Sequence, residues 1–580
     1  MKRGIAVAMT AVLGLGASKA LVNAVSVRAD AGPGVGLLAQ GGFGDYRNSL
    51  AWSMAWFRGK LYVGTGRLVN CVENATVDYY LVVSERYKTQ PISGVRCPRN
   101  RYDMDLRAEI WQYTPSTGRW RMVYQSPVGR NPRARGKVIA RDIAFRGMVV
   151  YRDARGRKRL YVGGVTANEF IPELRRRHPP RILSTRDGLH FRATPARNLV
   201  GHTPSGYQRP MGFRSMEVWR GRLYVTASAT LAGQGAVYEV IRPWSRRARF
   251  RQVTPPNLAV FEMEVFNGSL YIGTGHRQRG YGVWRVTARR RHARATARVA
   301  QQTKPPDRKK QPPPPETQPP PPETQPPPPE MPPPAPGTQP PAPATQPPSS
   351  PSPRPPRSTR SVRTYRVNPI VTGGAGRGAT VTSVVSMHVF RHRLYVGSSG
   401  WYNNQGTPVS EMIRVDRRGR WQIVAGPRRT VGGVLRGPIS GLGDGFYNIF
   451  SAHFWRMEDY DGALYVTTND WSYLVRVAFP ELEPWLAGAI QSALAGEYGF
   501  DMWASCDGRD WFPVTRDAFG DSNMLDFGGR NLVPSPAGFF IGSANHPQGT
   551  KVWRSRVGAC SSLVAGNRWW PPERWAWARW

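Results

Sequence analysis

Residues 263–273 have the sequence Met263-Glu264-Val265-Phe266-Asn267-Gly268-Ser269-Leu270-Tyr271-Ile272-Gly273. Apolar and polar residues alternate on both sides of the Asn-Gly turn, which predicts two half-buried β-strands joined as a hairpin. Related stretches recur at 53–64, 215–225, 386–397 and 457–466, and in looser form at 143–163 and 532–542. Most copies contain Leu-Tyr-Val, so the chain is built from repeats of one unit.

A second hairpin follows each of these stretches. Its first strand is apolar, as in residues 283–286, and its second strand begins with an aromatic residue at Trp120, Phe191, Phe250, Trp421 and Trp511. One unit is therefore four antiparallel strands, and a period above 40 residues is typical of propellers, which bury the faces of each sheet against its neighbours. The sequence predicts an all-β fold, a seven-bladed β-propeller of four-stranded antiparallel blades.

The last blade needs a fourth strand from elsewhere in the chain. No confident strand follows residues 552–555, whereas Val35-Gly36-Leu37-Leu38 stands directly before the first blade. We expect this N-terminal strand to close the last blade. The alternative strand, Leu563-Val564-Ala565, stays open.

Two turns carry a resemblance to known families. Residues 113–120 (Tyr-Thr-Pro-Ser-Thr-Gly-Arg-Trp) resemble a kelch outer hairpin, and residues 505–511 (Ser-Cys-Asp-Gly-Arg-Asp-Trp) resemble an Asp-box turn that is one residue short. Residues 184–191 are a looser version of the second turn. The chain thus resembles the kelch and Asp-box propellers, which implies an architecture and no particular chemistry.

The N-terminus has the pattern of an export signal. Lys2 and Arg3 precede an apolar run over residues 5–17, which is short for a membrane span. We expect residues 1–31 to be a signal peptide, with Ala20 as the alternative cleavage position to Ala31, and the chain to be secreted or held at the cell surface. Export argues against nucleic acid as a partner and permits disulfides.

The four cysteines fall into two pairs that are local in sequence. We expect the disulfides Cys71–Cys97, inside the first blade, and Cys506–Cys560, between the sixth blade and the end of the body. Metal binding by these cysteines is the weaker alternative, because no Cys-x-x-Cys spacing occurs.

A proline-rich stretch interrupts the repeats. Residues 304–357 contain the near-repeat Gln-Pro-Pro-Pro-Pro-Glu-Thr, which forms polyproline II and cannot pack a core. The stretch lies between the expected third and fourth strands of the fourth blade, so blades one to four occupy 32–303 and the rest of the body 358–560. It is either a tether into a cell wall or an insertion tolerated at an exposed turn.

The C-terminal tail, residues 561–580, is rich in tryptophan and arginine. Such a composition suits peripheral contact with a membrane surface or stacking on a sugar. Packing of the tryptophans over the rim of the propeller is the alternative. No later segment has the length and hydropathy of a membrane span.

The charge balance is extreme. The 81 Lys and Arg residues outnumber 38 Asp and Glu, giving a net charge of +43, and only ten of the 81 are Lys. A field of this sign attracts polyanions. A high arginine content can also reflect genome composition, so the charge alone leaves both interpretations open.

One column of the repeat places polar residues toward the propeller axis. The residue after the methionine, or its equivalent, is Ala55, Ala144, Glu217, Glu264, His388, Glu458 and Val533 in successive blades. Converging Glu217, Glu264, His388 and Glu458 are candidates for acid–base chemistry or for holding a divalent cation. Polar residues that line a water-filled channel are the alternative.

Loops on the face where propellers usually bind ligands supply a second set of candidates. Recurring Gly-Asp turns begin at Gly44, Gly443 and Gly520, where Asp and Asn either present ligands or cap turns. The ligand-binding candidates on this face are Asp45, His202, Arg214, His276, Asp444, His453 and His546.

Three functions are compatible with these features. The first is an exported, non-enzymatic protein that binds an anionic cell-wall or matrix polymer. The second is a polysaccharide lyase or hydrolase acting at the channel mouth. The third is a kelch-like scaffold for a protein partner. Gly-x-Ser-x-Gly, His-Glu-x-x-His and P-loop motifs do not occur in the sequence.

Overall fold

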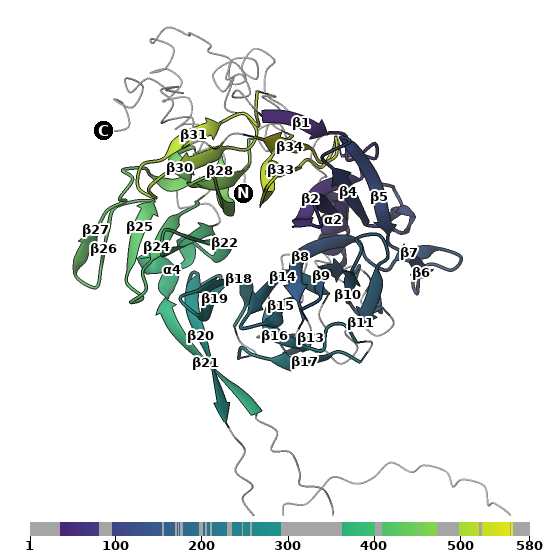
Figure 1. The fold of residues 1–580 in the computed structure, drawn as a ribbon, viewed down its shortest axis with the longest axis horizontal. Coiled ribbons are helices and arrows are strands. Elements are labelled where there is room, and N and C mark those ends of the chain that lie inside the picture. The colour runs from purple at the N-terminus through teal and green to yellow at the C-terminus, as the bar shows by residue number, and fades with distance from the viewer. Residues whose placement is uncertain are drawn as a thin grey trace, which may run out of the picture. The chain divides into compact units, whose positions relative to one another are not determined.

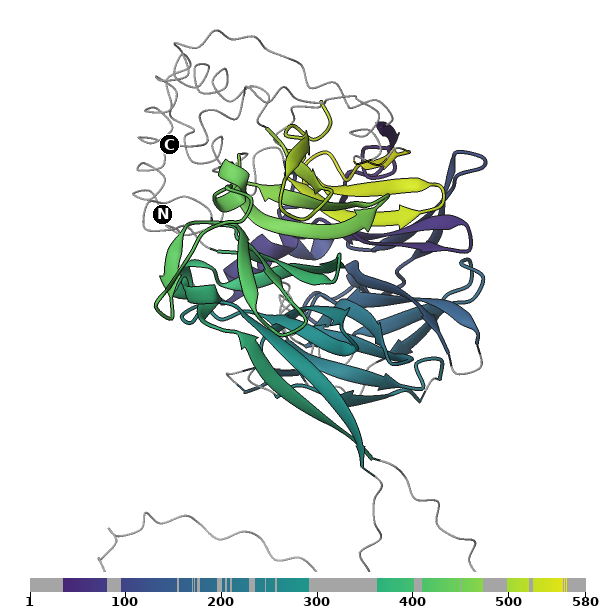
Figure 2. The same ribbon diagram turned by 60° about the vertical axis from the view of Figure 1, so that its left-hand side comes forward.

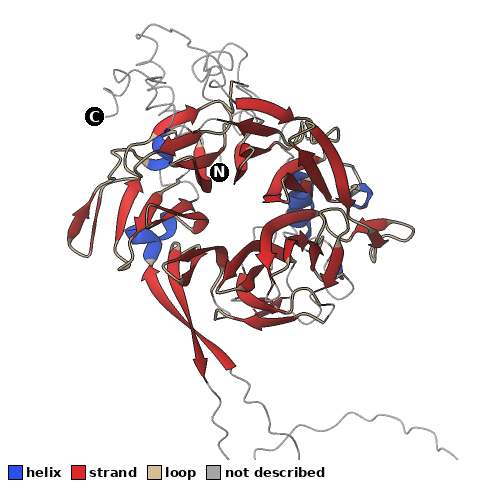
Figure 3. Ribbon diagram, viewed as in Figure 1, coloured by secondary structure: helices blue, strands red, loops and turns tan. Residues whose placement is uncertain are grey.

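The computed structural model describes most of residues 35–291 and 362–560, and the longest gaps within these ranges are 81–94, 401–408 and 473–497. The chain divides into a body, residues 1–288 and 365–580, and a second unit, residues 289–364. The described part of the body is mostly β-sheet, with almost entirely antiparallel pairing in a near-closed arrangement (Figures 1 and 3). No helix among the described residues has the length and apolar character needed to cross a membrane.

One strand order repeats through the body. β2 (Asn48–Phe57) pairs with β3 (Lys60–Arg67), β3 with β4 (Glu109–Thr114), and β4 with β5 (Arg119–Gln125), each time antiparallel. The same order recurs in β8 (Ala144–Arg152), β9 (Lys158–Val165), β10 (Arg181–Thr185) and β11 (Arg192–Pro195), and again in β14 (Gly212–Trp219), β15 (Arg222–Ser228), β16 (Gly235–Ile241) and β17 (Arg249–Gln252).

The second half of the body continues the pattern. The groups are β22 (Ser383–Phe390), β23 (Arg393–Ser399), β24 (Met412–Val415) and β25 (Trp421–Ala425), and then β28 (Ser451–Tyr460), β29 (Ala463–Asp470), β30 (Met502–Ser505) and β31 (Phe512–Thr515). Between the halves, β18 (Val260–Phe266) pairs with β19 (Ser269–Thr274), and β19 with β20 (Gly282–Arg291). The body parts of β20 and β21 (Val362–Val371) run side by side in Figures 1 and 2.

Strands from both ends of the chain meet in one sheet. β32 (Gly528–Ser535) pairs with β33 (Gly538–Ala544), β33 with β34 (Val552–Ser555), and β34 with β1 (Val35–Ala39), with Val35 opposite Ser555. The expected N-terminal strand therefore lies beside the last strand of the body. The signal segment, residues 1–31, the proline-rich stretch, 304–357, the alternative strand, 563–565, and the tail, 561–580, lie outside the described residues.

The first strand of each group contacts the first strand of the next. These strands, called the inner strands from here on, are β2, β8, β14, β18, β22, β28 and β32, and β32 contacts β2 in turn. They encircle a common axis (Figure 1). Outside the repeat stand the short hairpins β6 (Val128–Arg130) with β7 (Val138–Ala140), β12 (Gly201–Thr203) with β13 (Gly206–Gln208), and β26 (Arg429–Val431) with β27 (Val434–Arg436), and the helices α2 (Val69–Tyr80) and α4 (Gly373–Gly376).

The register of β8 corrects the sequence alignment. Ala144 was expected to lie level with Glu217, but Val149 is the residue opposite Tyr161, as Glu217 is opposite Tyr224. Met148 occupies the methionine position of this strand, so the inner strand of the looser repeat lies further along the chain than the alignment predicted. The expectation for Ala144 is wrong, and an apolar side chain stands at this depth of β8.

The glycine at the end of Leu-Tyr-Val-Gly allows neighbouring inner strands to approach closely. A Cβ on Gly397 would lie 2.4 Å from Ser386 Oγ and 2.7 Å from the carbonyl oxygen of Phe454 in the next inner strand. A Cβ on Gly64 would lie 2.7 Å from Phe145 Cβ. Similar crowding surrounds Gly163, Gly273 and Gly542. The motif therefore encodes the spacing between sheets as well as the strand.

Outer turns with an Asp-Gly pair are held by their own hydrogen bonds. Asp507 Oδ1 accepts from Ser505 Oγ at 3.2 Å and from the backbone N–H groups of residues 509 and 510 at 2.8 and 2.9 Å. Asp187 Oδ1 accepts the same set of bonds in the turn over residues 185–190. The carboxylates of both turns are thus occupied in shaping the backbone.

Both predicted disulfides are present, Cys71–Cys97 and Cys506–Cys560. The first bond joins the loop before β4 to α2, a helix that no sequence pattern had indicated. Val69, Val72 and Ala75 of this helix are buried in the core between the first two strand groups. Because disulfides persist in oxidising compartments, the two bonds indicate an oxidising, extracellular environment.

Replacing Gly397 by alanine is expected to destabilise the body by about 1–3 kcal/mol, because the new methyl group meets backbone that cannot move without parting two sheets. Gly36 in β1 has open space at the Cβ position and provides the matched control, Gly36→Ala. Denaturant unfolding of both variants measures the difference. Equal stability of the two variants would contradict this role for the glycine.

Candidate functional site

Four polar side chains stand at one depth of the inner strands. Glu217, Glu264, His388 and Glu458 each lie opposite the tyrosine of the Leu-Tyr-Val motif in the following strand. We call these four residues the axial cluster. All four side chains are partly exposed, although each of their strands lies between two other strands. The sequence prediction placed these residues at the axis, and the register puts them at a common level.

His388 forms the centre of the axial cluster. Its Nδ1 lies 3.7 Å from Glu458 Oε2, and its Nε2 lies 2.7 Å from Asp459 Oδ1. Arg456 Nη2 donates to Glu458 Oε1 at 2.7 Å. Although burial lowers the pKa of His388, the carboxylates of Glu458, Asp459 and Glu264 raise it above its ordinary value overall.

The two remaining carboxyl groups hold their protons near neutral pH. Burial raises the pKa of Glu217 to about 7 and that of Glu264 to about 8, and the neighbouring charge of Glu458 adds to both shifts. Glu217 and Glu458 stand on strands that are not neighbours in the ring, and the charge of Glu458 nevertheless contributes to the raised pKa of Glu217. Carboxyl groups with such pKa values can donate or accept a proton at physiological pH.

The axial cluster does not form a ready metal centre. Among the described residues, no group of three or more His, Cys, Asp or Glu side chains is arranged to hold a metal ion. What the cluster offers in this geometry is a set of coupled proton donors and acceptors.

A second tier lies three residues earlier on the inner strands, where a β-bulge recurs. The register shifts at Trp52, Arg146, Phe261, Trp455 and Arg530, and at residues 214–215 of β14. Arginine on one strand lies over an aromatic ring on the neighbouring strand in three places: Arg146 over Trp52 at 4.9 Å, Arg214 over Phe261 at 5.1 Å, and Arg530 over Trp455 at 5.0 Å from Cζ to ring centroid.

We call Arg146, Arg214 and Arg530 the arginine tier. Their charges act on one another: burial lowers the pKa of Arg146 far below its usual value, and Arg214 and Arg530 lower it further. Burial, Arg214 and Arg456 lower the pKa of Arg530, to about 9. Of these three residues only Arg214 was singled out from sequence. A signal for the others existed, since each stands two residues before the methionine position of its repeat.

The predicted loop aspartates are engaged in ion pairs. Asp444 accepts from Arg377 at 2.6 and 2.9 Å, and Asp45 Oδ2 lies 2.8 Å from Nη1 of the buried Arg67. His276 Nδ1 accepts from the backbone N–H groups of residues 278 and 279, so it holds its own turn. His202 lies in β12 opposite Tyr207, and its side chain lies outside what the structure describes.

His453 and His546 belong to one aromatic cluster near the arginine tier. The ring of His453 lies 6.0 Å from Trp455, Trp455 lies 6.1 Å from Phe527, and His546 lies 4.7 Å from Phe527. Burial lowers the pKa of His453 to about 4, with Arg214 and Arg530 adding to the shift, and burial lowers that of His546 to about 3. Both imidazoles are therefore neutral at physiological pH.

A buried charge recurs at the start of the third strand in several groups. Glu109 pairs with Arg67, Arg181 with Asp142, Glu411 with Arg429, and Lys551 with Asp526. At the matching position of β30, Asp501 instead meets another carboxyl group, Asp470 of β29, and Asn448 Nδ2 donates to both at 3.2 and 3.3 Å. Burial raises the pKa of Asp470 to about 8, with Asp501 contributing.

This arrangement makes stability fall as pH rises from about 4 to 8, because the unfolded chain releases the Asp470 proton over that range and the folded chain keeps it. Asp470→Asn mimics the protonated form, so we expect the variant to lose part of this slope, up to about 1.4 kcal/mol per pH unit, and to exceed the parent in stability near pH 8. Denaturant unfolding between pH 5 and 9 measures this. Asp526→Asn, which leaves Lys551 buried without its carboxylate, is the control and should be destabilised.

Parallel pH profiles for Asp470→Asn and the parent chain would contradict a buried Asp470 that keeps its proton near neutral pH.

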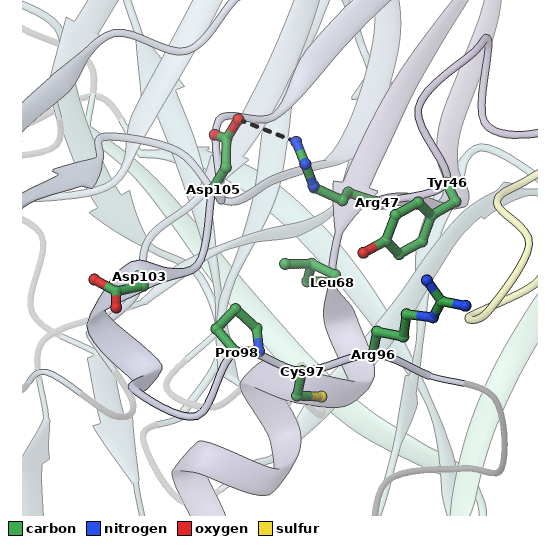
Figure 4. Close-up of a pocket in the computed structure, with 8 residues that line it drawn as sticks. All are labelled: Tyr46, Arg47, Leu68, Arg96, Cys97, Pro98, Asp103 and Asp105. Atoms are coloured by element: carbon green, nitrogen blue, oxygen red, sulfur yellow. Dashed lines mark ion pairs between the residues drawn. The ribbon is translucent and has the colours of Figure 1, made fainter.

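A separate pocket of about 320 Å³ lies beside α2 (Figure 4). Its lining consists of Tyr46, Arg47, Leu68, Arg96, Cys97, Pro98, Asp103 and Asp105. Arg47 lies 3.7 Å from Asp105. A hydrogen bond from Arg107 and the charge of Arg67 help to hold the pKa of Asp105 at about 2. Because that carboxylate is already neutralised, the pocket is a weaker candidate than the two axial tiers.

Comparison with known proteins adds fold likeness only. No family model and no curated protein matches the chain. A catalytically inactive virginiamycin B lyase from Staphylococcus aureus is 6% identical with a TM-score of 0.37, covering 88% of this chain and 96% of that chain. A prolyl endopeptidase is 9% identical with a TM-score of 0.33, covering 83% of this chain and 42% of that chain. A luciferin-regenerating enzyme is 10% identical with a TM-score of 0.30, covering 75% and 88%. At these scores the likenesses carry no argument about activity.

Proposed function

We propose that the body is a seven-bladed propeller of the kelch and Asp-box type, closed by its N-terminal strand, in an exported protein. The repeated strand order, the ring of contacts between inner strands and the pairing of β1 with β34 support this architecture. The hydrogen bonds around Asp187 and Asp507 support the Asp-box comparison. The two disulfides support export.

We further propose that the protein binds an anionic cell-wall or matrix polymer. The observation that carries this proposal is the burial of many carboxylates inside the body. Ten are buried among the described residues: Glu109, Asp142, Asp153, Glu239, Glu411, Asp416, Asp470, Asp501, Asp517 and Asp526. Four arginines are buried alongside them, namely Arg67, Arg181, Arg214 and Arg530. The surface is consequently even more basic than the net charge of +43 indicates, and such a surface attracts polyanions.

Binding to immobilised acidic polysaccharides should be strong at low salt and should weaken on the order of tenfold or more as salt rises to physiological strength and above, because ions screen exposed charges. The carboxyl-reduced form of the same polymer is the matched control and should not bind. Retention on the columns across a salt series measures both. Salt-insensitive binding, or equal binding to the reduced polymer, would overturn the proposal.

A lyase or hydrolase is the second candidate, favoured by the axial cluster. Glu264 and Glu217 with pKa values near neutrality, next to His388, suit proton transfer at physiological pH. In this case Glu264→Gln and His388→Asn would each lower turnover of an acidic polysaccharide by about 100-fold, with binding to the polymer retained. Unchanged turnover in both variants, or no turnover by the parent chain, would exclude this function.

The scaffold interpretation has less support. Large exposed apolar side chains occur at Val128 and Val138 of the β6–β7 hairpin and at Val434 and Leu435 of the β26–β27 hairpin. These two hairpins project from opposite sides of the body in Figure 1, so these four residues belong to two separate places on the body.

A further inference from the structure

We propose that the arginine tier is a binding site for one carboxylate group of an acidic sugar, presented at the axis of the ring. This inference rests on the proposed function, polyanion binding, and assigns its specific contact. Arg530 is the centre of the site.

Arg530 is a buried charge without a carboxylate partner. Its residue is 6% exposed, and among the residues that the structure describes no Asp or Glu forms an ion pair with it. Its Nε has no hydrogen-bond partner. By contrast, Arg214 Nε donates to Glu262 Oε1 at 3.0 Å, and Arg456 donates to Glu458. Because an unpaired buried charge destabilises the folded protein, binding of an anion at this position is favourable.

The charges of neighbouring residues make anion binding beside Arg530 still more favourable. Arg214 and Arg456 lie close enough to lower its pKa, and Arg214, Arg530 and Arg146 repel one another at the same level of the ring. Glu262 offsets part of this charge although it already pairs with Arg214, and Glu73 acts on Arg146 in the same sense. An anion bound among the three guanidinium groups would relieve the repulsion between them.

Stacking on aromatic rings fixes the orientation of the guanidinium groups. Each arginine of the tier lies over the face of a ring from the adjacent inner strand, at 4.9–5.1 Å. The attraction between a guanidinium and a ring face does not use up its N–H donors, and the planar fork of these donors matches the two oxygens of a carboxylate. The stacking also restricts the side chains before a ligand arrives, which reduces the entropy lost on binding.

The axial cluster lies about three residues further along the same strands, roughly 10 Å away. Its carboxyl groups are less repulsive to an anion than their number indicates. Glu217 and Glu264 are largely protonated below pH 7, and Arg456 offsets Glu458. The groups facing Glu264 are His388, Glu217, Glu458 and Arg456, so the charge of this level is close to balanced until both glutamates ionise.

The test uses calorimetric titration with a galacturonate tetramer and with its carboxyl-reduced, neutral counterpart. We expect the full chain to bind the tetramer and to ignore the neutral form. Arg530→Gln should weaken binding of the tetramer by about 10- to 100-fold, the loss typical of a charge-assisted hydrogen-bonded pair. Arg119→Gln, which removes the same charge from an exposed position in β5, is the matched control and should change affinity by less than about twofold.

Folding of Arg530→Gln is checked by its unfolding curve, and Arg146→Gln, on inner strand β8, provides a second variant that should also weaken binding. Equal affinities of the Arg530 and Arg119 variants would overturn the site while leaving salt-dependent polymer binding intact, so the site and the proposed function can fail separately. Tighter binding of inorganic sulfate than of the tetramer would overturn the assignment to a carboxylate.

Discussion

Close approach between neighbouring sheets is the constraint on which the rest of this body depends. At Gly397 a single methyl group would collide with the backbone of the next inner strand, and Gly64 is confined in the same way by Phe145. Small residues at this one position let each sheet press its inner strand against the next. The ring of inner strands follows from repeating that contact around the axis.

Equal spacing has a consequence for chemistry. Because every inner strand meets its partner in the same register, a given repeat position recurs at the same level around the axis. One level collects Glu217, Glu264, His388 and Glu458, and the bulge three residues earlier collects arginines and aromatic rings. The body thus places acidic and basic side chains in separate tiers. In the basic tier, Arg530 has no carboxylate partner among the described residues.

Much of this could be predicted from the sequence, because strands have a period of two and the Leu-Tyr-Val repeat marks their register. The axial cluster was predicted in this way, β1 from the missing fourth strand of the last repeat, and both disulfides from the sequence-local pairing of the cysteines. The register of the looser repeat could not be predicted in this way, and Val149 occupies the position expected for Ala144. Helix α2 is an insertion outside the repeat. Its apolar face could not be recognised without knowledge of the core that it covers. The roles of Asp45 and Asp444 depend on Arg67 and Arg377, which are distant in sequence, so spacing alone could not separate ion pairing from ligand binding.

Extending the same alignment to two residues before each methionine position would have revealed three arginines and three aromatic residues in one column, although the bulge that brings them into contact is a property of the folded strands. The decisive experiment for carboxylate binding by the arginine tier is a crystal structure of the chain with the galacturonate tetramer. We expect one sugar carboxylate within hydrogen-bonding distance of Arg530 and of Arg146 or Arg214. A tetramer bound only at the outer surface, with the three arginines unoccupied, would contradict it.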